Sequence, residues 1–297
     1  MKIIITGATG FVGKNLSKYL EDLGHSVLPL SVRNSWVLDK NAYAVVHLAG
    51  KAHDTQNTSA EKEYFEINTE LTKKIFQEFL DSQIRVFIYF SSVKATADSV
   101  EGYLDENHLS NPVTPYGKSK LEAEKYLLNQ KLPEDKKLFI IRPCMIHGPG
   151  NKGNLNLLYK VVEKGIPYPL AAFENQRSFL SIDNLNFLIF EILKNRDVSS
   201  GIYNFADDNS ISTNELIRII GEASRIKSKL WRLPAGIISS VAKLGDVLKL
   251  PLNSERLRKL TESYVISNQK IKTALGISEL PISVEKKKKK TIKSFKK

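Results

Sequence analysis

The sequence has few of the residues and segments that crosslink a chain or anchor it in a membrane. Cys144 is the only cysteine among 297 residues, which excludes an internal disulfide and any metal site built from several cysteines. Charged residues interrupt every long apolar run, and Met1 leads into an apolar strand without the basic start of a secretory signal. We therefore expect a cytoplasmic globular protein with no integral membrane segment. His47 and His53 flank the HLAG segment and are expected to be loop or core histidines, since their spacing to other ligands suggests no metal site.

The net charge of +12 is concentrated at the carboxyl end. The tail 285–297 carries eight lysines and one glutamate, so it contributes +7 and leaves +5 for the rest. Because no pattern of aromatics and arginines accompanies this run, we expect no nucleic-acid partner. The stretch 233–252 is broken by Lys243, Asp246 and Lys249, which predicts an amphipathic helix facing the core.

Three glycines, at positions 7, 10 and 13, follow an apolar β-branched run that predicts a buried strand. Apolar residues at helical spacing come next, and Gly24 ends that predicted helix. A glycine turn at a helix amino end leaves room and free N–H donors for a phosphate. The segment therefore predicts a dinucleotide site, while a tight turn that uses glycine only for backbone freedom stays open.

The first half of the chain alternates strands and helices, which predicts an α/β fold with a doubly wound parallel sheet. Strands are predicted at 25–32, 43–50, 85–92 and 137–148, and helices at 62–82 and 119–130. Ligands of such sheets bind at the carboxyl ends of the strands. Beyond Gly150, polar loops alternate with helices near 184–194, 213–225 and 255–260, which predicts a smaller lobe against the sheet.

Tyr116 and Lys120 lie four residues apart at the start of a predicted helix, so their side chains share one face. A nearby lysine cation favours the phenolate, which would lower the tyrosine pKa and let it exchange a proton with a substrate. A serine at the end of the strand before, Ser91 or Ser92, could hold the same substrate oxygen; the strand register favours Ser92.

The order of TGATGFVG, HLAG, Asn68, FSS, YGKSK and RPCMIHGPG resembles the extended short-chain dehydrogenases/reductases, and within them the nucleotide-sugar epimerase/dehydratase family. The resemblance implies a Rossmann-type dinucleotide-binding domain at 1–153, to which about 180–206 return, and a nucleotide-sugar lobe at 154–297. It also implies a nucleotide-diphosphate sugar substrate, with UDP as the expected nucleotide, and a possible homodimer.

By the same resemblance Tyr116 is the catalytic acid/base, Lys120 binds the nicotinamide ribose, and Ser92 binds the reacting sugar oxygen. The other expected cofactor contacts are Gly7, Gly10, Phe11, Val12, Leu48, Ala49, Gly50, Asn68, Pro143 and Ile146. Expected substrate contacts are Asn154, Arg177 and Arg256. Arg177 is the best candidate for a diphosphate ligand, although an ordinary salt bridge stays open for both arginines.

The second predicted strand ends without the acid that binds the ribose hydroxyls in NAD-preferring sites; Ser31 and Arg33 lie within reach of that position instead. This pattern favours NADP(H) over NAD(H). Together with the SSVK form of the serine motif, it favours an NADPH-dependent reductase that transfers hydride to C4 of a UDP-linked 4-keto sugar in surface-polysaccharide synthesis. A UDP-hexose 4-epimerase with bound NAD is the alternative, and a non-catalytic NADP-sensing module is a remote one.

Overall fold

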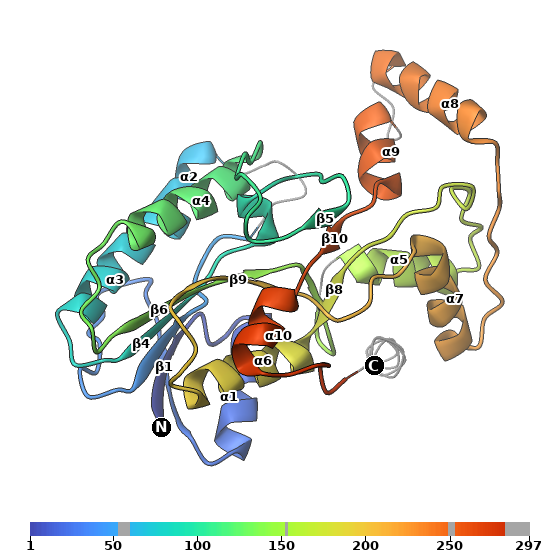
Figure 1. Ribbon diagram of the computed structural model, residues 1–297. Helices are drawn as coiled ribbons and strands as arrows, with labels where there is room; N and C mark the ends of the chain where they lie inside the picture. The colour runs from blue at the N-terminus through green and yellow to red at the C-terminus, as the bar shows by residue number, and fades with distance from the viewer. Residues whose placement is uncertain (53–59, 152–153, 249–252, 283–297) are drawn as a thin grey trace.

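The computed structural model describes residues 1–52, 60–151, 154–248 and 253–282. Its centre is a six-stranded sheet in which every neighbouring pair is parallel. In sheet order the strands are β2 (Ser26–Leu30), β1 (Lys2–Thr6), β3 (Ala44–His47), β4 (Val86–Phe90), β6 (Lys137–Pro143) and β9 (Gly201–Phe205) (Figure 1). The expected doubly wound Rossmann-type sheet is confirmed.

Both faces of the sheet are covered, because successive strand residues point to opposite sides. Ile3 and Ile5 pack in one core with helices α1 (Phe11–Asp22) and α6 (Ile182–Lys194), whereas Ile4 packs in the other core. That second core also contains residues of α3 (Leu71–Leu80) and α4 (Pro115–Leu128). Burial on both faces accounts for the nearly continuous apolar sequences of the strands.

The strand order reverses direction between β1 and β3. The chain passes from β1 outward to β2, then crosses to β3 and continues to β4, β6 and β9. In open parallel sheets, such a reversal leaves a crevice at the carboxyl ends of the two strands. The glycine turn follows β1, and the HLAG segment follows β3. Both therefore border the expected ligand crevice.

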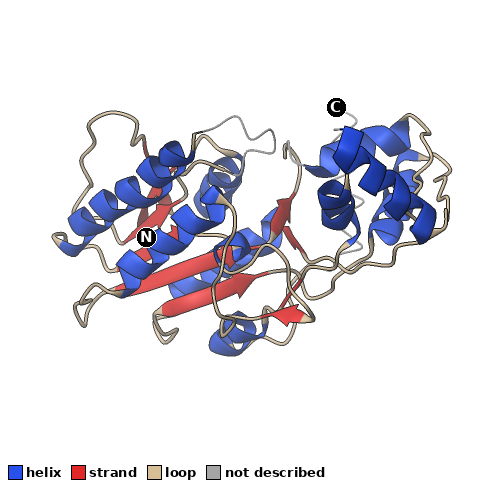
Figure 2. Ribbon diagram, turned by 90° about the horizontal axis from the view of Figure 1, so that it is seen from above, coloured by secondary structure: helices blue, strands red, loops and turns tan. Residues whose placement is uncertain are grey.

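The rest of the chain forms a mostly helical lobe beyond the carboxyl end of the sheet (Figures 1 and 2). Its helices are α5 (Asn154–Glu163), α7 (Thr213–Ser224), α8 (Ala235–Leu248) and α9 (Ser254–Thr261). Two small parallel sheets connect it to the first part: β7 (Met145–His147) with β8 (Phe179–Ser181), and β5 (Tyr103–Leu104) with β10 (Val265–Ile266). Helix α10 (Gln269–Leu275) returns to pack beside β9.

Three elements differ from the sequence expectation. The strand predicted at 137–148 is two strands, because the chain turns at Cys144 and β7 leaves the main sheet to pair with β8. The helix predicted at 62–82 contains a π-helical turn at Glu66–Glu70, between α2 (Glu61–Phe65) and α3. Helix α8 forms as expected, but most of its apolar side chains face away from the core.

None of the helices in the described part of the chain combines the length and hydropathy of a bilayer span.

Candidate active site

The turn after β1 is shaped to bring backbone close to a ligand. Gly7 has φ +68°, and a Cβ there would lie 2.8 Å from the Ala49 nitrogen. A Cβ on Gly13 would lie 2.3 Å from the Gly7 carbonyl oxygen, so neither position tolerates a side chain. Gly10 is the N-cap of α1 and has no side chain to occupy the N–H groups of the first turn, where Phe11 and Val12 stand. This cradle fits a pyrophosphate.

A buried chain of hydrogen bonds joins the ends of β1 and β3 behind the turn. The Thr72 hydroxyl donates to the Asn68 carbonyl at 2.7 Å, so its oxygen is left to accept from His47 Nε2, 3.0 Å away. His47 Nδ1 is then the acceptor, and the Thr6 hydroxyl donates to it at 2.7 Å. The oxygen of Thr6 in turn accepts from the Ala49 N–H. His47 is thus a neutral core histidine, as expected for it; His53 lies outside the described residues.

This histidine makes stability depend on pH. Burial lowers the pKa of His47 from 6.5 to about 3, so between these values it is protonated only in the unfolded chain. The free energy of unfolding is therefore expected to fall as pH falls below 6.5, by about 1.4 kcal/mol per pH unit from this group. Urea unfolding at several pH values should show a shallower slope for His47→Gln. The exposed His108→Gln is the control, and equal slopes for His47→Gln and the wild type would contradict this assignment.

Asn68 lies between the HLAG segment and α4. Its side chain donates to the Lys51 carbonyl at 3.1 Å and to the Ser119 hydroxyl at 3.0 Å, and it accepts from the Lys51 N–H at 2.8 Å. Gly50 packs directly against it, since a Cβ there would lie 2.9 Å from Asn68 Oδ1 and 3.2 Å from Lys120 Nζ. Asn68 therefore fixes the wall formed by Leu48, Ala49 and Gly50, the segment predicted to contact the cofactor.

Tyr116 and Lys120 are held by the start of α4. Thr114 caps this helix by accepting from the Gly117 N–H, and Pro115 occupies its first position. Lys120 is buried, donates to the Phe90 carbonyl at 2.8 Å and lies 4.8 Å from the centre of the Tyr89 ring. The two predicted catalytic side chains thus stand at the carboxyl end of β4, beside the HLAG wall.

The two serines after β4 have different partners. Ser92 hydrogen-bonds the Tyr116 side chain and caps the short helix Val93–Ala95 by accepting from the Lys94 N–H. Ser91 instead donates to Glu124 on α4. The geometry therefore supports Ser92, rather than Ser91, as the hydroxyl beside the tyrosine.

The electrostatics of Tyr116 differ from the sequence expectation. Burial raises the pKa of Tyr116 above its ordinary 10.0, and the hydrogen bond with Ser92 opposes that rise. Burial also lowers the pKa of Lys120 to about 8, while Glu124 opposes that shift. The expected lowering of the tyrosine pKa by Lys120 is wrong here, because burial dominates. Tyr116 is a neutral phenol with a proton to donate.

Glu124 and Arg142 form an ion pair that the sequence reasoning missed. Arg142 Nε donates to Glu124 Oε1 at 2.9 Å, and both side chains are almost fully buried. The pair joins α4 to β6 and holds Ser91 at the end of β4. Two features of the sequence could have indicated this pair. Arg142 interrupts an apolar strand, and Glu124 follows Lys120 by four residues on the same helix.

The segment after β6 approaches the glycine turn. Pro143 ends β6 and is buried, while Ile146 lies in β7 and is half-buried. A Cβ on Gly148 would lie 3.3 Å from the Phe11 ring. The segment that carries these predicted nicotinamide neighbours thus reaches the start of α1 at Gly148.

The segment around Arg177 is attached to the loop that starts at Ser92 through Tyr264. Arg177 is half-buried, and its Nε donates to the Glu262 carbonyl at 3.3 Å, just beyond the end of α9. Two residues further, the Tyr264 hydroxyl donates to the Ala97 carbonyl at 2.6 Å, and the Lys94 amine lies 4.4 Å from the centre of its ring. Tyr264 thereby ties the Arg177 segment to the loop that starts at Ser92. No sequence motif pointed to Tyr264.

The structure gives less information on the other two predicted substrate contacts, Arg256 and Asn154. Arg256 is exposed in the first turn of α9, where its N–H donates to the Asn253 side chain at 2.8 Å. Asn154 begins α5, but its side chain lies outside the described part of the structure.

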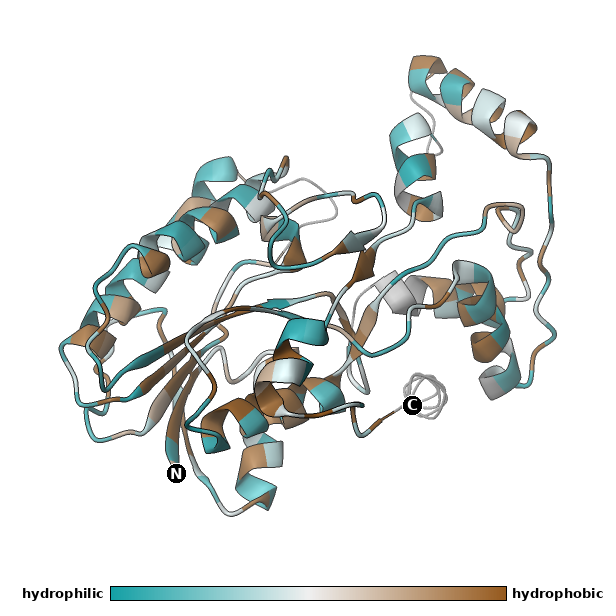
Figure 3. Ribbon diagram, viewed as in Figure 1, coloured by the Kyte–Doolittle hydropathy of each residue, from teal (hydrophilic) through white to brown (hydrophobic). Residues whose placement is uncertain are grey.

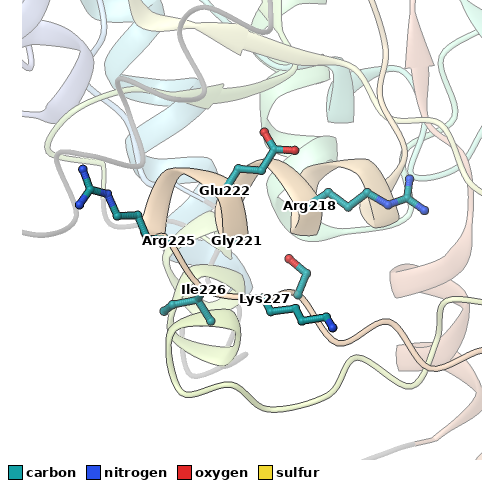
Figure 4. A pocket seen from close by; sticks show the side chains of 7 residues that line it. Arg218, Gly221, Glu222, Arg225, Ile226 and Lys227 are labelled. Atoms are coloured by element: carbon teal, nitrogen blue, oxygen red, sulfur yellow. The ribbon is translucent and has the colours of Figure 1, made fainter.

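The pocket in Figure 4 lies elsewhere, at the end of α7. It is lined by Arg218, Gly221, Glu222, Arg225, Ile226, Lys227 and Ser228, none of which is a predicted site residue. The crevice of the sheet, and not this pocket, collects the candidate chemistry.

Comparison with known proteins decides the family. The model of the NAD dependent epimerase/dehydratase family matches residues 3–206. The chain belongs to this family. It is 33% identical to a UDP-glucose 4-epimerase of Vibrio cholerae over 265 residues, which cover 79% of each protein.

Two further comparisons concern reduction and cofactor. The chain is 32% identical over 165 residues to a UDP-2-acetamido-2,6-beta-L-arabino-hexul-4-ose reductase of Pseudomonas aeruginosa, covering 52% of this chain and 38% of that protein. Its fold matches the structure of RMD from Pseudomonas aeruginosa complexed with NADPH, with a TM-score of 0.76, 18% identity and 100% of both chains covered. The chain is thus an enzyme of the NAD-dependent epimerase/reductase family.

Proposed function

We propose that this enzyme is an NADPH-dependent 4-ketoreductase acting on a UDP-linked sugar. The observation that carries the proposal is the end of β2. No acid occurs from Ser26 to Leu38, and the exposed Ser31 and Arg33 directly follow the strand. The next acid in the sequence, Asp39, pairs at 2.8 Å with Lys2 at the amino end of β1. The segment that ends β2 therefore offers a cation and contains no carboxylate that would repel a 2′-phosphate.

The reaction needs one proton at the substrate oxygen. When bound, the nicotinamide cofactor supplies the hydride to C4. Tyr116, kept protonated by burial, donates its proton to the C4 oxygen as that oxygen becomes a hydroxyl. Ser92 orients the same oxygen through its hydroxyl, and Lys120, whose pKa is about 8, is mostly protonated at neutral pH beside the wall at Gly50.

The lobe supplies the rest of the substrate site in this proposal. Arg177 presents a guanidinium, which suits the diphosphate because it donates two parallel hydrogen bonds. Its attachment through Glu262 and Tyr264 to the Ser92 loop would keep the diphosphate at a fixed distance from Tyr116. The predicted homodimer remains a separate expectation.

Arg33→Ala is expected to reduce NADPH affinity about 10- to 100-fold while leaving NADH affinity unchanged, because a charge-assisted contact worth about 1.5–3 kcal/mol is lost. Fluorescence titration with each cofactor measures the change. Lys40→Ala removes an exposed cation further along the same segment and serves as the control. Equal affinity of the wild type for both cofactors would contradict the assignment of Arg33.

A UDP-hexose 4-epimerase is the second candidate, supported by the relative in Vibrio cholerae. An epimerase keeps its cofactor through two half-reactions, whereas a reductase exchanges it in every turnover. One reaction should therefore contain UDP-glucose or UDP-N-acetylglucosamine alone, and a second a UDP-4-keto-6-deoxy sugar with NADPH. NADPH oxidation in the second reaction only supports the proposal. A C4 epimer in the first supports the epimerase, and no turnover in either supports a non-catalytic module.

A further inference from the structure

Helix α8 has two apolar faces, and the protein covers one of them. Ile238 and Ala242 are buried against Leu170 and Leu257. On the adjacent face, about a quarter turn around the helix, Ile237, Val241, Leu244 and Leu248 are 60%, 47%, 55% and 58% exposed. Their spacing of four, three and four residues places them along one line of the helix. We call these four residues the outer stripe.

Other exposed apolar side chains lie near the outer stripe. Val247 is exposed next to it on the same helix, and Trp231 and Leu233 are exposed in the segment that leads into α8. Figure 1 shows α8 at the far end of the lobe, away from the sheet, and Figure 3 shows apolar residues along it. An apolar surface of this extent in a globular protein indicates an interaction site.

The charge around the outer stripe is strongly positive. Residues 227–262 contain eight lysines and arginines against three acids. Lys229, Arg232 and Lys243 are exposed, and at 3.6 residues per turn Lys243 stands beside Val247, about 100° around the helix from Leu244 of the stripe. Asp246, the one acid of α8, projects from nearly the opposite side. The partner should therefore offer apolar contact and negative charge together.

We propose that the outer stripe binds the surface of an anionic lipid bilayer, with α8 lying in the plane of the interface. Aliphatic side chains would enter the boundary between headgroups and acyl chains, and the basic residues would contact anionic headgroups. A second copy of this chain fits less well, because a two-fold interface would bring the same basic residues together. The proposal is independent of the reaction that the enzyme catalyses.

The test is cosedimentation of the full chain with sucrose-loaded vesicles, without nucleotides. Vesicles of phosphatidylcholine and phosphatidylglycerol at about 3:1 are expected to bind the protein, and pure phosphatidylcholine at least about tenfold less. Val241→Asp with Leu244→Asp should weaken binding at least about tenfold. Arg232→Glu with Lys243→Glu should weaken it by about fivefold or more for each residue. Leu109→Asp, which changes a 90% exposed leucine outside the lobe, is the matched control.

Unchanged melting curves would show that the variants fold, as their exposed positions predict. The proposal is overturned if the wild type does not bind anionic vesicles. It is also overturned if the two aspartate substitutions and the two glutamate substitutions both leave binding at the wild-type level. Replacing Lys286–Lys290 by glutamine tests the basic tail: loss of binding in that variant alone would also overturn it. Sedimentation that shows a wild-type dimer, and a monomer for Val241→Asp with Leu244→Asp, would assign the stripe to a second copy instead.

Discussion

Replacing Tyr116 by phenylalanine is expected to lower turnover by about 100- to 10,000-fold, the usual contribution of a positioned proton donor. The ring stays, so packing against Tyr64 is retained, with ring centres 6.2 Å apart. Only the hydroxyl that bonds Ser92 is lost. Since no part of the glycine turn changes, cofactor affinity should remain as in the wild type. Initial rates and a cofactor titration measure the two quantities separately.

Tyr126→Phe is the matched control for this change. Tyr126 lies ten residues further along the same helix, where it is half-buried beside Lys73. It should leave turnover unchanged. Near wild-type turnover of Tyr116→Phe would contradict the assignment of Tyr116, whereas equal losses of turnover and cofactor binding would indicate a structural role.

Glu124→Gln is expected to destabilise the protein by about 3–5 kcal/mol, because it leaves the Arg142 guanidinium buried without its counter-charge. The change also weakens the hydrogen bond that the Ser91 hydroxyl donates to residue 124. Ser91 is the residue before Ser92, which hydrogen-bonds Tyr116. Turnover should therefore fall even at temperatures where the variant is folded. Urea unfolding and initial rates measure the two effects.

Glu122→Gln provides the control on the same helix. Glu122 is half exposed and lies 3.7 Å from the Lys73 amine, so its loss should cost less than about 0.5 kcal/mol. The double variant Glu124→Gln with Arg142→Met should recover part of the stability, since no buried charge is left unpaired. A Glu124→Gln variant as stable as the wild type would show that the ion pair contributes little.

The parts of the site predictable from sequence are those that local geometry controls. The spacing of Gly7, Gly10 and Gly13 between a strand and a helix predicts a close approach of backbone, and the structure shows backbone where each of Gly7 and Gly13 would carry a Cβ. Tyr116 and Lys120 share a helix, so their proximity follows from helical periodicity. These motifs also sufficed to place the chain in its family.

The parts that sequence reasoning missed depend on contacts between distant segments. Tyr264 reaches the Ala97 carbonyl 167 residues away, which no local pattern encodes. The tyrosine pKa depends on burial, which the sequence does not give and which raises the pKa despite the hydrogen bond from Ser92. The apolar period of α8 predicts an amphipathic helix, but it cannot tell which apolar face packs against Leu170 and which is exposed.

The most direct test of the proposed function follows the hydrogen that reaches the sugar. The enzyme is incubated with a UDP-4-keto-6-deoxy sugar and NADPH deuterated at both C4 positions of the nicotinamide, and the product is examined by mass spectrometry and NMR. A ketoreductase that donates its proton from Tyr116 should place one deuterium at sugar C4 for each NADPH oxidised. Conversion of UDP-glucose or UDP-N-acetylglucosamine to its C4 epimer without added cofactor, together with no deuterium in the deoxy sugar, would contradict the account.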